Sequence, residues 1–259
     1  MSAVRVERVV KSFGGVHAVR DVSFDVPRGT LTALIGPNGA GKTTLFNVLT
    51  NVYPPNSGAI HLLDQPVTGL PSWHIGRMGV VRTFQTARVF PGMTVLENLQ
   101  VGAHQHLRGG MWQQMATTRL TRREEQSVRD RAEYLLRLVG LGAFRDMAAM
   151  SLPMGAQKML EMARALMAAP KLLLLDEPAA GLNDTETDEL ALLLRSVRNC
   201  GITVMVVEHN MSLVMKAADE IIVLDAGQLV ARGTPEAIRG DPRVIEAYVG
   251  RIEAEAGHA

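Results

Sequence analysis

The 259-residue sequence has one cysteine (Cys200), no long apolar run and almost no net charge. A single cysteine cannot form an internal disulfide bond, which excludes the small disulfide-stapled secreted proteins. The longest apolar runs, such as Leu172–Leu175 and Val204–Val207, are far shorter than the ~20 residues that span a bilayer. With 27 Lys+Arg against 26 Asp+Glu, the net charge of +1 creates no overall field that attracts nucleic acid or an acidic membrane surface.

The start of the chain also lacks a signal peptide. Met1–Lys11 alternates polar and apolar residues and has no continuous apolar core of the kind that a signal peptide needs. A chain of this length buries roughly three quarters of its unfolded surface, so its core needs no covalent staples. We therefore expect an intracellular α/β protein that has no nucleic-acid partner.

Apolar periodicity predicts strands and helices along the whole chain. Strands are expected around Val4–Val10, Val19–Val26 and Leu31–Ile35, and a helix is expected from Lys42. In the second half, short apolar strands alternate with helices, which indicates a largely parallel sheet covered on both faces. The elements expected there are strands at Leu172–Leu175, Ile202–Val207, Ile221–Leu224 and Gln228–Ala231, and helices at Glu186–Arg198, Met211–Ala217 and from Pro235 and Pro242.

Between these halves lies a stretch without strand signals. Thr94 is followed three residues later by Glu97, the pattern of a helix-capping box. Tyr134, Leu135, Leu138 and Val139 form an apolar stripe at helical spacing. We predict one domain over residues 1–259, with a helical block inserted at 88–165 and a helical tail at 235–259.

A phosphate-binding motif follows the third predicted strand. Gly36-Pro37-Asn38-Gly39-Ala40-Gly41-Lys42-Thr43 matches G-x-x-x-x-G-K-[ST], and the next residue is Thr44. The glycines let backbone N–H groups turn inward around phosphate oxygens, and the start of the helix adds its dipole. Lys42 is expected to reach the outer phosphates, and the Thr43 hydroxyl to bind Mg²⁺.

A second motif strengthens this interpretation. The apolar strand Leu172–Leu175 ends in Asp176 and Glu177, and ligands of open α/β sheets bind beyond the carboxyl ends of the strands. Asp176 is placed to face the metal, and Glu177 to polarise an attacking water. Together, the two motifs predict a nucleoside-triphosphate hydrolase.

The adjacent Asp176-Glu177, followed by Pro178-Ala-Ala-Gly-Leu-Asn183, resembles the ATP-binding cassette (ABC) ATPases. The resemblance covers nearly the whole chain. It implies a phosphate-loop core with an N-terminal antiparallel β-subdomain and an inserted α-helical subdomain. It also implies that Phe13 stacks on adenine, that Gln85 links the metal and the water to the membrane partner, and that His209 contacts the γ-phosphate.

Four segments resemble the ATPase subunits of branched-chain amino-acid importers in particular. These importers carry two ATPase paralogues, and the long insert Ala103–Glu133 resembles the longer of the two. These segments are Arg82-Thr-Phe-Gln85, Met93–Asn98, Asp176–Asn183 and Asp241–Gly250. Related importers carry urea, short amides, or hydrophobic and aromatic acids. The implied partners are two membrane-spanning permeases, a second ABC ATPase and, indirectly, a solute-binding protein. The implied location is the cytoplasmic face of the inner membrane, and the implied ligands are ATP and Mg²⁺.

The sequence departs from the family in its signature turn. The matching stretch is Leu152-Pro153-Met154-Gly155-Ala156 followed by Gln157, where this branch usually has a serine or alanine at the position of Pro153. Gly155 retains a backbone N–H for the ATP of an opposing subunit, and Gln157 follows it, but Pro153 has neither a hydroxyl nor an N–H. We expect an asymmetric or partner-dependent ATPase. The alternatives are an ABC module that binds nucleotide with little hydrolysis, and an ABC ATPase that serves no transporter.

Overall fold

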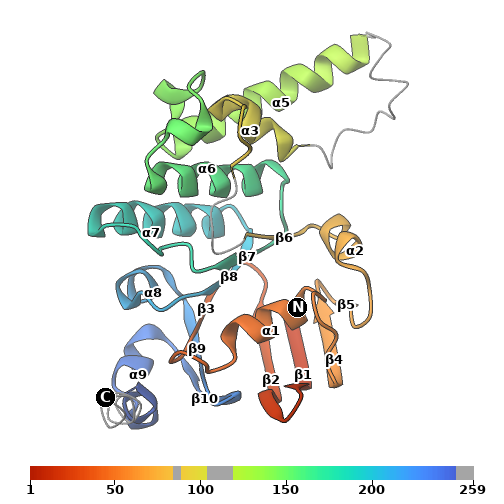
Figure 1. Ribbon diagram of the computed structural model, residues 1–259, viewed down its shortest axis with the longest axis vertical. Helices are drawn as coiled ribbons and strands as arrows, with labels where there is room; N and C mark the ends of the chain where they lie inside the picture. Colours follow the sequence, from red (N-terminus) through yellow and green to blue (C-terminus); the bar gives the residue numbers. More distant parts are fainter. Residues whose placement is uncertain (84–88, 104–118, 249–259) are drawn as a thin grey trace.

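The computed structural model describes residues 1–83, 89–103 and 119–248, of which residues 119–124 are described by their backbone alone. The molecule has three layers, with a helical block at one end, a parallel sheet in the middle and an antiparallel sheet beside it (Figure 1). Within the described residues, no helix is both long and apolar enough to cross a membrane.

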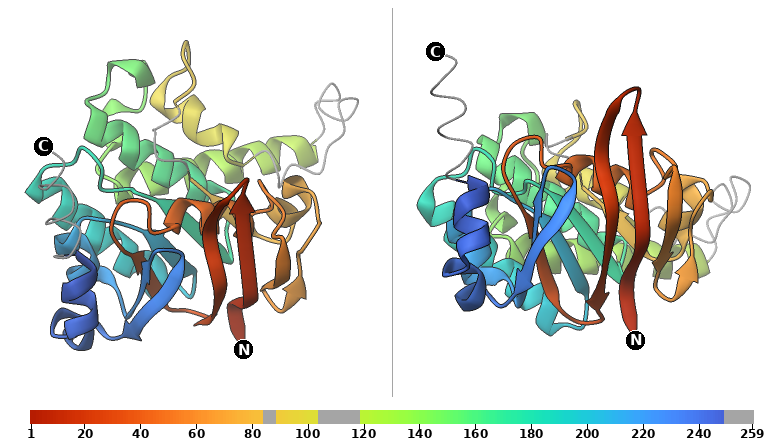
Figure 2. Two further views of the ribbon diagram at one scale, coloured as in Figure 1. Left: turned by 60° about the horizontal axis from the view of Figure 1, so that its bottom comes forward. Right: turned by 90° about the horizontal axis from the view of Figure 1, so that it is seen from below.

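Two long strands begin the chain. β1 (Ser2–Phe13) and β2 (Val16–Pro27) pair antiparallel, and β4 (Ser57–Leu62) and β5 (Gln65–Pro66) complete a four-stranded sheet of order β2-β1-β4-β5. Most valines of β1 and β2 are buried, whereas most of the polar residues between them are partly or fully exposed. This antiparallel sheet confirms the expected N-terminal β-subdomain and stands at one side of the molecule (Figure 2).

The central sheet has six strands in the order β10-β9-β3-β8-β7-β6. Its neighbours from β9 to β6 are parallel, and only the β9–β10 hairpin is antiparallel. This arrangement confirms the predicted largely parallel sheet. The strands are β3 (Leu31–Ile35), β6 (Val80–Arg82), β7 (Leu172–Asp176), β8 (Thr203–Val207), β9 (Glu220–Asp225) and β10 (Gln228–Gly233).

Different layers cover the two faces of this sheet. One face packs on α1 (Lys42–Leu49) and the antiparallel sheet, and the other packs on α7 (Asp184–Asn199), α8 (Met211–Ala217) and the helical block. Strand β7 contributes side chains to the core on both faces of the sheet. Leu173 and Leu175 belong to one core cluster, and Leu172 and Leu174 belong to the other. A continuous apolar run is therefore required here rather than an alternating one.

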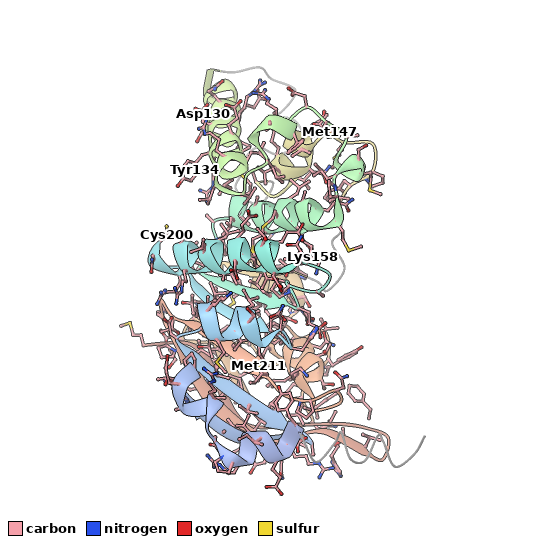
Figure 3. The ribbon with its side chains drawn as sticks, turned by 90° about the vertical axis from the view of Figure 1, so that its left-hand side faces the viewer. Asp130, Tyr134, Met147, Lys158, Cys200 and Met211 are labelled. Carbon is pink, nitrogen blue, oxygen red and sulfur yellow. The ribbon has the colours of Figure 1, made fainter. Side chains whose placement is uncertain are left out.

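The helical block contains α3 (Val95–Val101), α5 (Arg119–Leu138) and α6 (Met154–Met167), with 3₁₀ turns at Gly142–Phe144 and Ala149–Ser151. Thr94 and Glu97 form the expected capping box, and the two hydrogen bonds that Thr94 donates to Glu97 lower the pKa of that carboxyl group. The apolar residues of the α5 stripe are not all buried. Leu135 is buried, but Tyr134 is 59% exposed and Leu138 42% exposed, and Tyr134 projects away from the molecule (Figure 3).

The tail and a short connecting segment complete the fold. α9 (Pro235–Arg239) and a second helical turn at 242–248 follow the hairpin as expected. Two short elements were not predicted from the sequence, α2 (Ser72–Arg77) and the two-residue strand β5. The boundaries of the inserted block at 88 and 165, and the end of the tail at 259, stay predictions.

The shared role of β7 generates a stability prediction. Leu174→Ala removes a fully buried side chain between the sheet and α1, and we expect it to lower the free energy of unfolding by about 2–5 kcal/mol. Leu192→Ala is the control, because Leu192 lies on α7 and is 65% exposed. Urea unfolding measures both. Equal midpoints for the two variants would contradict the assignment of β7 to a core that packs on both of its faces.

Candidate functional site

The glycine-rich loop lies between the buried strand β3 and helix α1. Gly36, Gly39 and Gly41 all have positive φ angles, of 151°, 75° and 97°. A Cβ atom on Gly36 would lie 2.0 Å from the carbonyl oxygen of Leu224, and one on Gly41 would lie 2.2 Å from that of Ala18. Only glycine fits these two positions, because both the backbone conformation and the neighbouring backbone exclude a side chain.

The β9–β10 turn supports this loop from outside. The backbone N–H of Gly227 donates to the carbonyl oxygen of Ala40 at 3.0 Å, and Arg20 N–H donates to the carbonyl oxygen of Gly227 at 2.7 Å. Lys42 is 7% exposed, and its ammonium group donates to the carbonyl oxygens of Gly36 (2.7 Å) and Pro37 (3.0 Å). The lysine thus lies across the loop that it follows in sequence.

A cavity of about 360 Å³ opens over this loop. Its lining brings together the residues of the predicted phosphate loop and the carboxylate of the second motif, although these are far apart in the chain. The lining residues are Val16, His17, Ala18, Arg20, Asn38, Gly39, Ala40, Gly41, Lys42, Thr43, Thr44, Glu177 and Ala226. The structure therefore brings Lys42, Thr43 and Glu177 to one place, as the sequence predicts.

Glu177 and His209 face each other at the carboxyl ends of neighbouring strands. β7 and β8 pair in parallel register, with Asp176 opposite Val207, so the residues that follow each strand emerge side by side. The Nδ1 atom of His209 lies 3.7 Å from Oε2 of Glu177. The His209 side chain is 58% exposed, whereas that of Glu177 is 19% exposed. A carboxylate beside an imidazole at a phosphate loop can accept a proton from water while the imidazole binds an anionic oxygen.

Asp176 is held by a partner that the sequence analysis quoted but gave no role. Its Oδ2 atom accepts a hydrogen bond from Nη2 of Arg82 at 2.9 Å, and the two side chains are 7% and 9% exposed. Nη1 of Arg82 also donates to the Thr50 hydroxyl at 2.9 Å. β6 and β7 are parallel neighbours, so the pairing follows from the sheet order, which a sequence motif does not contain.

The oxygen groups present suit a magnesium ion. Mg²⁺ prefers oxygen ligands and is commonly bound by one or two protein groups plus substrate phosphates. Thr43 lines the cavity with a hydroxyl group, and Asp176 is the last residue of the buried strand β7. No cluster of three or more His, Cys, Asp or Glu occurs among the residues that the structure describes. A site that takes most of its ligands from a bound triphosphate and water needs no such cluster.

The remaining predicted residues are more scattered. Phe13 ends β1 with 43% exposure, and its ring makes an edge contact with Tyr53 at 5.4 Å between centroids. It does not line the cavity, so its adenine contact stays a prediction. Gln85 lies outside the described residues, and its metal role stays a prediction as well.

The signature stretch forms the start of α6. Pro153 is the N-cap residue, and its side chain makes no capping hydrogen bond. Gly155 is buried, and a Cβ atom there would lie 2.2 Å from Oε1 of Glu186 at the start of α7. The Gln157 side chain donates to the carbonyl oxygen of Leu152 at 2.9 Å. A side chain at position 155 would therefore displace the carboxylate end of the Glu186 side chain.

The comparisons with known proteins agree with one another. A family model described as ABC transporter matches residues 19–180, and one described as branched-chain amino acid ATP-binding cassette transporter matches 228–254. One relative is the high-affinity branched-chain amino acid transport ATP-binding protein LivG of Escherichia coli (strain K12). It is 46% identical to this chain in an alignment that covers 95% of this chain and 96% of LivG. The corresponding protein BraF of Pseudomonas aeruginosa is 44% identical, over 95% of this chain and 97% of its own length.

Solved structures also share the fold, and two of them are more than 30% identical to this chain. One is the ADP conformation of an ATP-binding cassette of an ABC transporter, with a TM-score of 0.83 and 33% identity over 96% of this chain and 99% of that one. The other is a nucleotide-free cassette from an ABC transporter, with a TM-score of 0.81 and 32% identity over the same shares.

The buried Arg82–Asp176 pair generates a prediction. Arg82→Met leaves the Asp176 carboxylate buried without its cation, which costs about 3–5 kcal/mol of stability. The double variant Arg82→Met/Asp176→Asn should recover a large part of this loss, because no unpaired charge remains. Arg28→Met is the control, since the Arg28–Asp64 pair is about half exposed and is worth about 1 kcal/mol at most. Denaturant unfolding measures all three, and a double variant that is no more stable than Arg82→Met would contradict the pairing.

Proposed function

The chain belongs to the ABC transporter family of ATP-binding proteins, and on that premise we propose that it hydrolyses ATP to drive an importer of branched-chain amino acids. The observation that carries the hydrolytic part is the meeting of Lys42, Thr43 and Glu177 at one cavity, with His209 beside Glu177. The solute is inferred from the relatives LivG and BraF, whose names state branched-chain amino acid transport. The tail match at 228–254 supports the same branch of the family.

In the proposed reaction, a water molecule attacks the γ-phosphorus of ATP in line with the bond to the bridging β–γ oxygen. Glu177 orients this water and accepts its proton while the bridging bond breaks, and ADP leaves with the electron pair. His209 holds an oxygen of the transferred group. Lys42 and the loop N–H groups balance the negative charge of the triphosphate. A magnesium ion held by Thr43 and Gln85 and, through water, by Asp176 would supply further charge neutralisation.

The ammonium group of Lys42 has to move for this reaction. It now donates to two carbonyl oxygens of its own loop, and a bound triphosphate offers oxygens of full negative charge at the same place. Charge-assisted hydrogen bonds are stronger than those to neutral carbonyl groups. Exchange of the loop carbonyl oxygens for phosphate oxygens as hydrogen-bond acceptors of Lys42 thus favours nucleotide binding. The lysine stays buried throughout.

Partner proteins are required for transport, because the reaction alone moves no solute. We propose that two permease subunits dock on the helical block and that a second ABC ATPase closes over the cavity. Phe90 and Met93, which precede α3, are 41% and 38% exposed, and Met147, whose backbone carbonyl accepts from Val95 N–H, is 43% exposed. These apolar side chains fit a protein partner better than water. A permease partner places the chain at the cytoplasmic face of the membrane as a peripheral subunit.

The start of α6 supports a finer proposal, that the chain contributes weakly to the ATP site of its partner. The N-cap position offers no side-chain oxygen, because it is Pro153. In a pair with a cassette whose signature turn is intact, the site formed by this chain's phosphate loop hydrolyses ATP, and the reciprocal site is slower. A pair of identical chains is then a weak ATPase.

Substitution of Glu177 tests the main proposal. Glu177→Gln keeps the size of the side chain but removes the proton acceptor, so Mg-ATP binding should persist while turnover falls at least ~100-fold. In a strain that lacks the gene, the wild-type chain should restore uptake of labelled leucine, isoleucine and valine, and the variant should not. Unchanged turnover would remove Glu177 from its role, and wild-type uptake of urea in place of the three amino acids would contradict the proposed solute.

Substitution of Pro153 tests the proposal that this chain contributes weakly to the ATP site of its partner. Pro153→Ser adds a hydroxyl group to the signature turn, and one charge-assisted contact to phosphate is worth about 1.5–3 kcal/mol, so the ATPase rate of the chain alone should rise about tenfold or more. Pro71→Ser is the matched control, because Pro71 is also an N-cap residue without a side-chain hydrogen bond, but it precedes α2, outside the signature turn. An equal rate for Pro153→Ser and the wild type would show that backbone donors suffice.

A further inference from the structure

Glu208 is a fully buried acidic residue that the proposed reaction does not use. It follows β8 directly, precedes His209 and is 0% exposed. A buried carboxylate is unfavourable unless hydrogen bonds and a nearby cation compensate it. The hydrogen-bond partners of this carboxylate therefore indicate what the position is for.

Both carboxylate oxygens of Glu208 accept hydrogen bonds from backbone N–H groups. Oε1 accepts from Ala179 at 2.7 Å, in the loop that follows Glu177. Oε2 accepts from His209 and from Asn210, each at 3.0 Å. One carboxylate thus connects the loop that carries Glu177 with the turn that carries His209.

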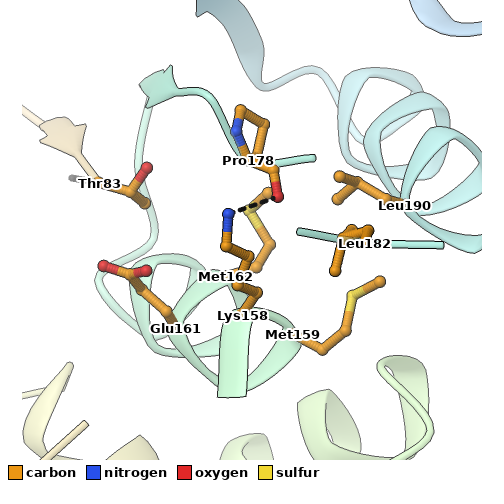
Figure 4. Close-up of a pocket in the computed structure, with 8 residues that line it drawn as sticks. All are labelled: Thr83, Lys158, Met159, Glu161, Met162, Pro178, Leu182 and Leu190. Carbon is orange, nitrogen blue, oxygen red and sulfur yellow. Dashed lines mark hydrogen bonds between the residues drawn. The ribbon is translucent and has the colours of Figure 1, made fainter. Parts of the chain in front are cut away.

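A third element reaches the same loop from the other side. Lys158 lies on α6, one turn after Pro153, and its ammonium group donates to the carbonyl oxygens of Glu177 (3.2 Å) and Pro178 (3.4 Å). Figure 4 shows this group pointing at Pro178 inside a small cavity of about 20 Å³, the space of about one water molecule. Burial lowers the pKa of Lys158, and the negative charges of Glu208, Glu161 and Glu177 oppose that shift.

The loop that these two side chains hold has a strained start. Glu177 has a φ angle of +48°, a left-handed conformation that is unfavourable for a residue with a side chain. Such a conformation persists when its surroundings fix it on several sides. Here the Glu177 N–H donates to the carbonyl oxygen of Val207 at 2.9 Å, and its own carbonyl oxygen accepts from Ala180 N–H at 3.1 Å as well as from Lys158.

We infer that Glu208 and Lys158 are positioning residues, which together fix Glu177 and His209 in the mutual geometry that ATP hydrolysis requires and connect both to the start of α6. This inference rests on the proposed function. The two residues touch neither the nucleotide nor the attacking water. They act through the backbone: Glu208 accepts from the Ala179 N–H, and Lys158 donates to the Glu177 and Pro178 carbonyl groups of the same loop. Because α6 begins at the signature turn, a shift of that helix is transmitted to the Glu177 carbonyl through Lys158.

The first test replaces Glu208 by glutamine in the full-length chain assembled with its transporter. Glu208→Gln keeps the size of the side chain, but its amide NH₂ group cannot accept the hydrogen bonds that one carboxylate oxygen accepts. We expect kcat for ATP to fall at least about tenfold and the dissociation constant for Mg-ATP to change less than about threefold. Hydrogen exchange at the amides of Ala179, His209 and Asn210 should become faster. Glu220→Gln is the control, since Glu220 pairs with Arg232 on the far strands of the sheet.

The second test concerns Lys158 and does not depend on the folding of the first variant. Lys158→Met should lower kcat without weakening Mg-ATP binding, and Lys158→Arg should restore most of the rate because it retains the charge and the donors. The double variant Lys158→Met/Glu208→Gln should lose less than the product of the two single losses, because both act on one loop.

Three results would overturn the inference. The first is an unchanged kcat in Glu208→Gln. The second is a fall in kcat accompanied by equal losses of Mg-ATP binding and thermal stability. The third is a kcat for Lys158→Arg that is no higher than that for Lys158→Met. A wild-type chain that hydrolyses no ATP would instead contradict the proposed function. The exchange rates of the three amides would still show in that case whether Glu208 holds the two loops.

Discussion

The parallel alignment of β3, β7 and β8 is the constraint on which the site depends. Parallel strands end at the same edge of a sheet, and each of these three strands is followed at that edge by one part of the site. The phosphate loop follows β3, Glu177 follows β7, and His209 is the second residue after β8. The residues of the site are distant in sequence, so a change in the strand order would separate them.

Hydrogen bonds between neighbouring elements then fix the positions of the residues that the strand order brings together. The β9–β10 turn supports the phosphate loop through Gly227, and Glu208 joins the two loops that carry Glu177 and His209. Arg82 holds Asp176 from the neighbouring strand β6. Each of these contacts is made by a residue whose own side chain or backbone is buried or half-buried, so the site is set by the core and not by its exposed side chains.

The sequence predicted most of the fold and the main groups of the site, for physical reasons that differ between elements. β3 and β7 are continuous apolar runs followed by motifs, and Thr94 with Glu97 is a local capping pattern, so short windows contain enough information. α5 is different. Its sequence is mostly polar, and its packing against α3 and α6 buries Leu135 while Tyr134 and Leu138 stay exposed. The contacts of Arg82, Lys158 and Glu208 were missed because they join strands and helices that are distant in sequence.

The central claim is that Lys42 and Glu177 act on the same triphosphate, and a structure of the Glu177→Gln chain with Mg-ATP, in complex with its partner cassette, tests it most directly. The account predicts the γ-phosphate between the Lys42 ammonium group and the side chain of residue 177, with the His209 imidazole in contact with a phosphate oxygen. A triphosphate bound elsewhere, or one whose γ-phosphate lies beyond hydrogen-bond reach of Lys42, would contradict it.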